Sequence, residues 1–458
     1  MQRLDIKDIL EATGGRLICG EPDFVVSEIT TDSRKAGVNM LFVPIVGENH
    51  DAHDYIGSAF ENGASAVITH RDIPAREGKN IIRVMDTRTA LGDIARYYKE
   101  KYNLPTVAVT GSVGKTTAKD MISSVLTMKY NTVKTQGNFN NDIGLPLTVF
   151  RLERKHEAVV LEMGMSHFGE IHYLASIAKP DIAVITNIGM SHIENLGSRE
   201  NIYRSKMQIC DFFDEKGVLI VNGDDDFLSK KREGIKTVTF GIKNKNCDIV
   251  SENIEDLGIE GCRFCVSLDG EKYEIAVKAA GVHNVYNALA AICVGRQMGV
   301  AAKDIVDGIG DFRPANMRMN VRHFGEVTVI DDCYNAAPDS IKAALSVLES
   351  VKSGRKIAVL GDVLEMGDFA EEALYKIGES ITDIDALITV GSNAHFIAKG
   401  AKAAGIVIES FDTVDETIEF LDKFICGGDN VLVKASRGMR FEKIVEAIKD
   451  RYGYAEIH

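Results

Sequence analysis

The sequence has no surplus of positive charge. Its 458 residues include 53 lysines and arginines against 67 aspartates and glutamates, which leaves a formal net charge of −14 at pH 7. Proteins that bind nucleic acid need basic residues to neutralise phosphates, so this balance argues against nucleic acid as a partner. Any anionic substrate would have to be held by local lysines, arginines and helix N-termini.

Long apolar runs and paired cysteines are also missing. There is no apolar leader at the N-terminus and no run long enough to span a bilayer, so we expect a cytoplasmic protein without membrane insertion. The eight cysteines are scattered, and a disulfide framework is unusual in a large cytoplasmic chain. Cys262 and Cys265 form a lone CxxC in a strand-like run, which favours ordinary thiols over a zinc site.

What the sequence does have is length and ordinary globular composition. A chain of 458 residues corresponds to about three domains, and 45% hydrophobic with 26% charged residues is typical of a globular protein. We predict an α/β protein with a small α/β N-terminal domain (1–83), a central domain with a P-loop-type parallel sheet (84–312) and a Rossmann-like C-terminal domain (313–458).

Short apolar runs alternate with helix-length segments through the second and third parts of the chain. This alternation predicts parallel sheets with crossover helices. The strands are expected at 106–110, 158–161, 182–185 and 218–221, and then at 327–330, 356–360, 386–390 and 430–433. Residues 237–277 alternate polar and apolar residues between turn signals, which predicts antiparallel hairpins inserted in the central domain. Polar residues follow the strands, where ligands bind in open α/β sheets.

A glycine-rich loop stands between the apolar run 105–109 and a helix-like run, 118–128. It consists of Thr110, Gly111, Ser112, Val113, Gly114, Lys115, Thr116 and Thr117. The glycines let backbone N–H groups close around phosphate oxygens at the positive end of a helix dipole. Lys115 can reach the outer phosphates, and the Thr116 hydroxyl can hold Mg²⁺. Gly111 and Gly114 are three residues apart rather than five, yet the strand–loop–helix context favours a nucleotide site over a plain tight turn.

Other polar residues offer chemistry, and each also has a plain structural interpretation. Glu162 follows a strand and suits either a second Mg²⁺ ligand or a solvated carboxylate. His192 stands in a loop, where a metal ligand and a surface group both fit, and Lys206 falls on a predicted helix (200–212), where lysines are usually solvated. The asparagine-rich loop 137–144 suits substrate amides and also simple turns.

Two further groups come later in the chain. Asn284 and Asn287 open a predicted helix, where asparagine caps the helix or binds a base edge. Near the start of the last domain, Arg318 and the pair Asp331-Asp332 are suited to clamp phosphates and hold a ribose.

Taken together, these segments resemble the Mur ligase family over nearly the whole chain. The matching segments are GSVGKTT (111–117), GNFNNDIGLPLT (137–148), EMG (162–164), TNIGMSHIENLGS (186–198), SK (205–206), HNVYNALAA (283–291), IDDCYNAAPDS (330–340), GDVLEMG (361–367) and VKASRGMR (433–440). GNFNN, DDCYNAAP and GDVLEMG are more particular to the branch that adds D-alanyl-D-alanine. The DNPR signature of the diaminopimelate-adding relative is missing from the sequence, and the short glycine spacing matches the family's loop.

The resemblance implies an ATP-dependent reaction with two Mg²⁺ ions. Lys115 and the loop amides would bind the β- and γ-phosphates, Thr116 and Glu162 would hold Mg²⁺, and His192 would support the second ion. Lys206 matches the lysine that the family carbamylates. Its carbamate would be an anionic support for the second ion, so the resemblance overrides the interpretation of Lys206 as a surface group.

The family's remaining contacts also carry over. Asn284 and Asn287 would contact adenine, and Arg318 and Asp331 would reach phosphate and ribose from the last domain. The residues that would face the UDP-sugar, its peptide or the dipeptide are Ser33, Arg34, Asn138, Asn140, Asn141, Asn335, Ser436 and Arg437. Three positions depart from the family: Met317 replaces the usual glycine, Gln208 a glutamate, and Ala52 the glycine of Asp-Gly-His. We expect Met317 to affect the approach of its linker to ATP.

The implied activity is the addition of D-alanyl-D-alanine to UDP-N-acetylmuramoyl-tripeptide through an acyl phosphate, which forms the pentapeptide precursor of peptidoglycan. We expect the enzyme to act as a monomer. The alternatives are a sister ligase that adds a single amino acid, or glutamate to folate, and a non-ligase regulatory nucleotide-binding protein of the GTPase-like kind. A GTPase would need a guanine-reading NKxD after a strand, and the chain has TNIG at 186–189 instead.

Overall fold

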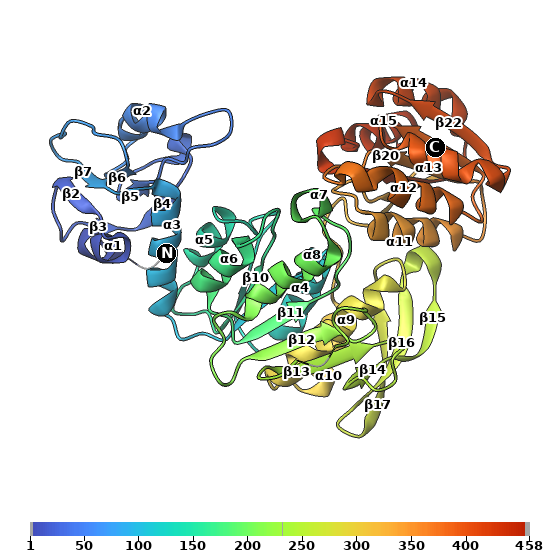
Figure 1. Ribbon diagram of the computed structural model, residues 1–458, viewed down its shortest axis with the longest axis horizontal. Helices are drawn as coiled ribbons and strands as arrows, with labels where there is room; N and C mark the ends of the chain where they lie inside the picture. Colours follow the sequence, from blue (N-terminus) through green and yellow to red (C-terminus); the bar gives the residue numbers. More distant parts are fainter. Residues whose placement is uncertain (1–2, 231, 454–458) are drawn as a thin grey trace.

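The computed structural model describes residues 3–230 and 232–453. Figure 1 shows three bodies, with the N-terminal and C-terminal ones at opposite ends and the largest between them. Each body is built around a β-sheet in which most neighbouring strands are parallel and are joined by helices. The predicted mixed α/β class with parallel sheets is therefore confirmed.

The N-terminal sheet has the strand order β2-β7-β6-β5-β4. Its elements are β2 (Arg16–Cys19), β4 (Glu28–Thr30), β5 (Met40–Phe42), β6 (Ala66–Thr69), β7 (Asn80–Arg83), α1 (Ile6–Thr13), α2 (Ile56–Glu61) and the small pair β1 (Leu4–Asp5) and β3 (Val25–Val26). Helix α1 ends at Gly14, whose φ of +63° is a left-handed conformation that glycine adopts without strain. Helix α3 (Thr87–Glu100) packs against α1 and also against α5 and α6 of the central body, so it joins the two bodies.

The central sheet has seven strands in the order β14-β13-β12-β11-β8-β10-β9, and every neighbouring pair is parallel. The strands are β8 (Thr106–Thr110), β9 (Thr132–Lys134), β10 (Ala158–Glu162), β11 (Ile182–Ile185), β12 (Val218–Asn222), β13 (Lys236–Gly241) and β14 (Ile249–Val250). The helices are α4 (Lys115–Thr127), α5 (Gly144–Val149), α6 (Glu170–Ala178), α7 (Ile193–Leu196), α8 (Arg199–Met207), α9 (His283–Gln297) and α10 (Ala302–Gly310).

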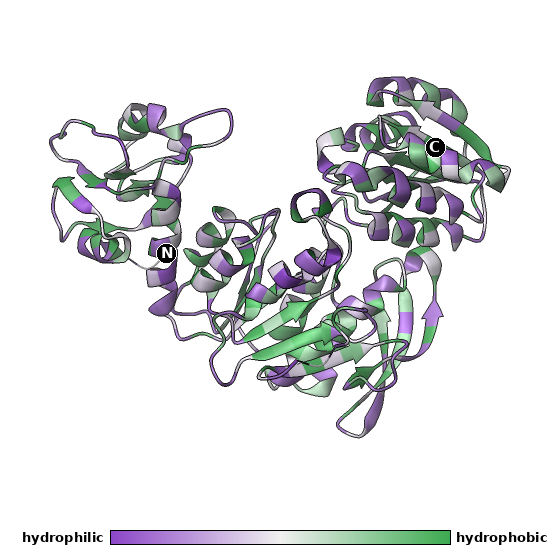
Figure 2. Cartoon of the chain, in the orientation of Figure 1, coloured by the Kyte–Doolittle hydropathy of each residue, from purple (hydrophilic) through white to green (hydrophobic). Residues whose placement is uncertain are grey.

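Both faces of the central sheet are covered, which explains its continuous apolar strands. Successive side chains of a strand point to opposite faces. In β8, Val107 and Val109 join the core formed with α4 and α9, while Ala108 joins the core on the other face with α6. Figure 2 shows the strands of this sheet as strongly hydrophobic. Because each buried valine contributes about 1.5–3 kcal/mol, the sheet is a rigid support for the loops at its edge.

The predicted hairpins are confirmed only in part. Strands β15 (Glu252–Asp256), β16 (Cys262–Leu268) and β17 (Glu271–Val277) form an antiparallel three-stranded sheet. The prediction was wrong for β13 and β14, which pair in parallel with the central sheet. Strand β13 lies near the sheet edge and is half-exposed over much of its length, so its alternating pattern imitated that of a hairpin strand.

The C-terminal sheet has the order β18-β19-β23-β20-β21-β22. Its elements are β18 (Asn320–Phe324), β19 (Val327–Asp331), β20 (Lys356–Gly361), β21 (Ala386–Val390), β22 (Val407–Phe411), β23 (Asn430–Lys434), α11 (Pro338–Glu349), α12 (Ala370–Glu379), α13 (His395–Ala401), α14 (Val414–Phe424) and α15 (Glu442–Tyr452). The four predicted strands are present and run parallel. The prediction missed both edge strands, β18 and β22. Among the described residues, no helix is both long and apolar enough to cross a membrane.

Candidate active site

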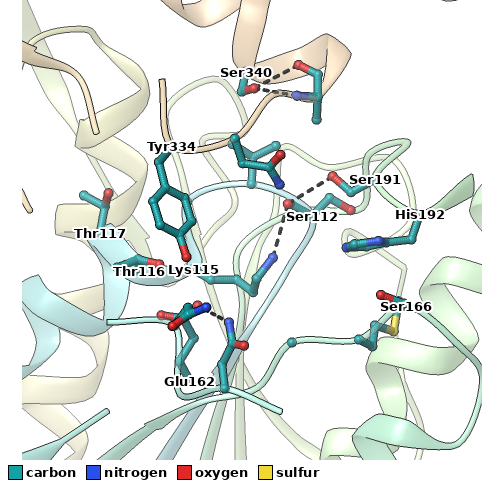
Figure 3. A pocket seen from close by; sticks show the side chains of 18 of the residues that line it. Ser112, Lys115, Thr116, Thr117, Glu162, Ser166, Ser191, His192, Tyr334 and Ser340 are labelled. Atoms are coloured by element: carbon teal, nitrogen blue, oxygen red, sulfur yellow. Dashed lines mark hydrogen bonds between the residues drawn. The ribbon is translucent and has the colours of Figure 1, made fainter. Parts of the chain in front are cut away.

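A cavity with a volume of about 1030 Å³ lies where the central body faces the C-terminal one. The glycine loop, the asparagine loop, the segment after β10 and the loop after β19 all contribute to its lining. Figure 3 shows Lys115 and Thr116 in this cavity with Glu162, His192 and Tyr334. The cavity therefore lies beyond the carboxyl ends of β8 and β10, where ligands bind in open α/β sheets.

The glycine loop joins β8 to α4, and both of its glycines have a backbone that disfavours other residues. Gly111 has a φ of +152° and Gly114 a φ of +84°. A Cβ at Gly111 would lie 1.9 Å from Oγ1 of Thr186, and a Cβ at Gly114 would lie 2.9 Å from Oδ1 of Asn287. The loop thus packs against two other segments too closely for a side chain at either position.

Lys115 is the cation at the centre of this loop. Its Nζ donates to the carbonyl of Gly111 at 2.7 Å and to that of Ser112 at 3.3 Å. Burial lowers the pKa of Lys115, the carboxylate of Glu162 opposes that shift, and the charge of Arg318 adds to it. A carboxylate of the central body and an arginine of the C-terminal linker therefore act on the same ammonium group.

The segment after β11 supports the glycine loop. The Asn187 side chain accepts from the N–H of Val113 and donates to the carbonyl of Val113, both at 2.9 Å. Oγ1 of Thr186 donates to the same carbonyl at 2.6 Å, and the N–H of Gly189 donates to Oγ of Ser112 at 2.8 Å. TNIG thus fixes the loop conformation, a role that the sequence analysis did not assign to it.

The residues predicted to hold Mg²⁺, Thr116, Glu162 and His192, all line the cavity. Glu162 is 1% exposed, and Nδ2 of Asn140 donates to its Oε1 at 2.8 Å. Its Oε2 has no hydrogen-bond partner within the described chain and lies 3.9 Å from Nζ of Lys119. Burial of a carboxylate oxygen without a hydrogen bond is costly, and Nζ of Lys119 is too far away to donate one, so this atom fits an additional cation.

Lys206 lies on α8 and is only 1% exposed, so its interpretation as a solvated surface lysine is wrong. Burial lowers the pKa of Lys206 well below 10.5, and the neighbouring charge of Lys115 lowers it further. Burial therefore favours the uncharged form of its amine. Only an uncharged amine attacks carbon dioxide, so the environment fits a lysine that is carbamylated.

Asn284 and Asn287 line the cavity from the first turns of α9. Nδ2 of Asn287 donates to Oδ1 of Asn284 at 3.0 Å, and Nδ2 of Asn284 donates to the carbonyl of Ala280 at 2.8 Å. These bonds fix which way each amide faces.

In the C-terminal body the cavity is lined by Asp332 rather than by the predicted Asp331. The Asp331 carboxylate faces Arg322 at 3.5 Å and Sγ of Cys333 at 2.9 Å. Asp332 accepts from Nζ of Lys434 at 2.5 Å and from the N–H of Met319 at 3.0 Å. Alternating side chains of a strand point to opposite sides, so a shift of one residue decides which carboxylate reaches the site.

Arg318 also lines the cavity, and its guanidinium lies 4.0 Å from the ring centroid of Tyr334. The preceding Met317 has a φ of +62°, a left-handed conformation that favours glycine, the residue that the resemblance leads one to expect there. The linker therefore keeps this conformation with a strained methionine.

The predicted substrate residues divide into two groups. Asn138, Asn140, Asn141 and Asn335 line the cavity. Outside its lining are the other predicted substrate residues, Ser33, Arg34, Ser436 and Arg437. Four residues predicted for ATP binding or catalysis also lie outside the lining: Thr110, Gly111, Lys206 and Asp331. Ser33 and Arg34 belong to a short 3₁₀ turn of the N-terminal body, where Arg34 lowers the pKa of Asp32 to about 2. Ser436 accepts from the N–H of Leu364 at 2.9 Å, and Arg437 pairs with Glu442 at 3.2 Å.

Several residues of the cavity were not predicted from the sequence. His283, Tyr334 and Lys434 lie in segments that resemble the Mur ligase family, and Arg88 and Tyr173 lie outside those segments. Burial lowers the pKa of His283, which keeps its imidazole neutral. The first three could have been found because they lie close in sequence to predicted site residues. Arg88 and Tyr173 lie on helices without a motif.

A separate group of possible metal ligands lies in the N-terminal body. Asp51, His53 and His70 offer ligand atoms within 4.8 Å of one another. However, Oδ1 of Asp51 binds Nδ1 of His53 at 2.6 Å, and Oδ2 pairs with Arg71. Because the carboxylate is already neutralised by Arg71, the group is better explained as a hydrogen-bonded cluster that fixes this loop.

Three family models match the chain in succession. Residues 25–99 match the Mur ligase family catalytic domain, residues 109–295 the Mur ligase middle domain, and residues 317–437 the Mur ligase glutamate ligase domain. Together they cover more than half of the sequence, and each of the three bodies contributes to a match.

Curated relatives match over nearly the whole length. The UDP-N-acetylmuramoyl-tripeptide–D-alanyl-D-alanine ligase of Bacillus subtilis is 39% identical over 97% of this chain and 98% of its own. The enzyme of the same name from Escherichia coli is 31% identical over 93% of this chain and 95% of its own.

Solved structures agree in fold. A crystal structure of MurF from Acinetobacter baumannii has a TM-score of 0.92 at 32% identity, covering 98% of this chain and 99% of that one. The MurF ligase of Thermotoga maritima in complex with ADP has a TM-score of 0.84 at 29% identity, covering 93% and 98%. With three matching domain models and full-length relatives above 30% identity, the chain belongs to the Mur ligase family.

Proposed function

We propose that the protein joins D-alanyl-D-alanine to UDP-N-acetylmuramoyl-tripeptide at the expense of ATP. Relatives that carry this activity in their names align with the chain from end to end. The observation that carries the proposal is the single cavity that the glycine loop shares with the asparagine loop and with the DDCYNAAP loop. The last two segments are the ones more particular to the D-alanyl-D-alanine-adding branch.

In this proposal ATP binds across the boundary between the central and C-terminal bodies. The amides of residues 112–117 and the charge of Lys115 bind the phosphates. Asn284 and Asn287 contact the adenine, and Arg318 approaches the phosphates from the linker. Of the two adjacent aspartates, Asp332 is the one positioned to reach a ribose, because it lines the cavity and Asp331 does not.

Two Mg²⁺ ions fit the same site. Thr116 and Glu162 would hold one and His192 would support the other, with a carbamate on Lys206 as an anionic partner. When bound, the ions neutralise charge on the transferred phosphoryl group. Two observations support these assignments: Oε2 of Glu162 has no hydrogen bond within the described chain, and burial lowers the pKa of Lys206.

The UDP-sugar end of the first substrate would bind in the N-terminal body, near Ser33 and Arg34. Its peptide would extend past Asn138, Asn140 and Asn141 into the cavity. The dipeptide would enter from the C-terminal side, where Asn335 lines the cavity and Ser436 and Arg437 lie further out. We keep the predictions of a monomer and of a cytoplasmic location as parts of this proposal.

The chemistry follows from the weakness of a carboxylate as an electrophile. An oxygen of the terminal tripeptide carboxylate attacks the γ-phosphorus, the bond to the β-phosphate oxygen breaks, and ADP leaves. The dipeptide amine then attacks the acyl carbon of the acyl phosphate, phosphate leaves, and the nitrogen loses a proton. The protein aligns the groups, supplies the charge of Lys115 and keeps water from the acyl phosphate.

The test is phosphate release by the purified protein with ATP, the UDP-linked tripeptide and the dipeptide. Release should require all three, and mass spectrometry should show the UDP-linked pentapeptide. Equal release without the dipeptide would exclude the ligase. Single amino acids, and glutamate with folate, replace the acceptor and substrate in parallel reactions, and a product there in place of the pentapeptide would identify a sister ligase.

A further inference from the structure

His192 and Glu365 meet across the boundary between the central and C-terminal bodies. His192 precedes α7, and Glu365 lies in the loop between β20 and the 3₁₀ turn Gly367–Phe369. Nδ1 of the imidazole and Oε2 of the carboxylate form an ion pair. Nδ1 is buried and makes no hydrogen bond of ordinary geometry within the described chain, where the Glu365 carboxylate is its ion-pair partner.

Both residues hold a backbone conformation that costs free energy. His192 has a φ of +62° and Glu365 a φ of +61°, both in the left-handed region. A residue other than glycine is strained in that region, so the surrounding contacts must impose the conformation. Two strained residues that contact each other across two bodies indicate that their positions serve a function.

The backbone around the pair is docked as well. The N–H of Glu194 donates to the carbonyl of Glu365 at 3.3 Å. A Cβ on Gly367 would lie 3.1 Å from Cγ of Glu194, so the two segments are in close contact. Figure 1 shows α7 at the edge of the C-terminal body. The side-chain pair is therefore part of a docked surface rather than a chance meeting of long side chains.

The carboxylate also determines which nitrogen of His192 is free. A carboxylate against Nδ1 holds a proton on that nitrogen, which leaves the lone pair on Nε2. His192 lines the cavity, as Figure 3 shows. Histidines that bind metals commonly give their other N–H to a carboxylate, which sets the ring orientation and strengthens the ligand.

We propose that Glu365 is a positioning residue that acts through His192, an inference that rests on the proposed function for the identity of the cation. From the C-terminal body it fixes the imidazole with Nε2 available to the cavity. The cation-holding set is then complete only while the C-terminal body rests on α7. Docking of that body and cation binding thereby become one linked equilibrium.

The test compares Glu365→Ala, Glu365→Gln and Glu365→Asp with Glu372→Gln. Glu372 is an exposed residue of α12 whose ion-pair partner in the described part of the chain is Lys376, one turn away, so it controls for loss of a glutamate charge on the same body. The probe is Mn²⁺ in the presence of ADP, measured by electron paramagnetic resonance. Removing a carboxylate behind a ligating histidine costs about 10- to 100-fold in metal affinity, so that weakening is expected for Glu365→Ala.

Two further readouts separate positioning from a general loss of structure. ADP affinity in EDTA should stay at the wild-type value in every variant, because no cation is involved. Nitrogen NMR of the imidazoles, with His192 assigned by its loss in His192→Gln, should show the Nδ1–H form in the wild type and a mixture in Glu365→Ala. Glu365→Gln should retain part of the affinity, since its amide oxygen still accepts from Nδ1–H.

Wild-type Mn²⁺ affinity together with an unchanged His192 tautomer in Glu365→Ala would overturn the inference. A variant that also loses ADP affinity in EDTA would overturn it too, because the glutamate would then support the fold. None of these measurements uses the UDP-linked substrate or the dipeptide. If the wild type fails as a ligase while Glu365→Ala still weakens Mn²⁺, the proposed function is wrong and the positioning role remains.

Discussion

Gly114 of the glycine loop lies against Asn287 of α9, so close that a Cβ on the glycine would be 2.9 Å from Oδ1 of the asparagine. The two positions are 173 apart in the numbering, and the loop and the helix meet only in the folded domain. Gly114→Ala should therefore weaken ATP binding in two ways. It strains a backbone with φ +84°, at about 1–2 kcal/mol, and it displaces the Asn287 amide, which we propose contacts the adenine. We expect at least about a tenfold loss of ATP affinity by calorimetry, equivalent to about 1.4 kcal/mol.

Gly405→Ala is the matched control. Gly405 has a φ of +70°, and a Cβ there would meet nothing within 4 Å. That variant should lose stability from backbone strain and keep the ATP affinity of the wild type. Equal ATP affinities for the two variants would show that the contact with Asn287 is irrelevant.

Substitutions of the adjacent Asp331 and Asp332 should change the KM for ATP to different extents. Asp332 lines the cavity and Asp331 does not, so Asp332→Asn should raise the KM for ATP more than Asp331→Asn does. Each change removes a charge that pairs with a cation, Lys434 for Asp332 and Arg322 for Asp331, and both should lower the melting temperature. The KM for ATP, and not the melting temperature, therefore distinguishes the two variants. A larger effect at Asp331 would restore the assignment made from the sequence.

The thiols report on the cores of the fold. Cys426 is exposed, whereas Cys262 is buried and burial raises its pKa to about 12. At about pH 8 a thiol-specific reagent reacts with the thiolate, so Cys426 should be modified first and Cys262 only on unfolding. Peptide mass spectrometry after a time course gives the order. Early modification of Cys262 would mean that β16 is not packed as described.

How far the sequence predicts the molecule depends on the physical origin of each signal. Strand β8 and the glycine loop were predictable because a buried parallel strand is continuously apolar and the loop needs glycine. Strand β13, one strand in from the sheet edge, was not, since its half-exposed residues alternate as in a hairpin strand. The role of Lys206 was predicted from the family resemblance. Its position on a predicted helix indicated a solvated side chain, and this prediction failed because Lys206 is buried.

Contacts between segments that are distant in the sequence could not be predicted, for a different reason. Gly114 with Asn287, and His192 with Glu365, join segments whose order along the chain says nothing of their distance in space. Asp331 and Asp332 show that the sequence also does not reveal which of two adjacent residues reaches the cavity. Both follow a predicted strand, and only the strand's orientation in the sheet decides which carboxylate enters the cavity.

Lys206 should oppose stability and support activity. A lysine that is 1% exposed pays for burial of its amine, so Lys206→Met should raise the melting temperature in buffer free of carbon dioxide. The same variant should lose ligase activity, because methionine forms no carbamate. Arg204→Met, an exposed change on the same helix, should leave activity near wild type and stability within about 0.5 kcal/mol.

The pH dependence of stability tests the direction of the pKa shift of Lys206. The pKa of Lys206 is lowered on folding, so between that lowered value and 10.5 the unfolded chain carries a proton on this amine that the folded chain does not. Wild-type stability should therefore rise with pH relative to Lys206→Met, and the gap in melting temperature should narrow as the pH rises from the lowered pKa toward 10.5. Added bicarbonate should stabilise the wild type alone, since only it binds carbon dioxide in the folded state. A constant gap with no bicarbonate effect would mean that Lys206 is charged in the fold and is not carbamylated.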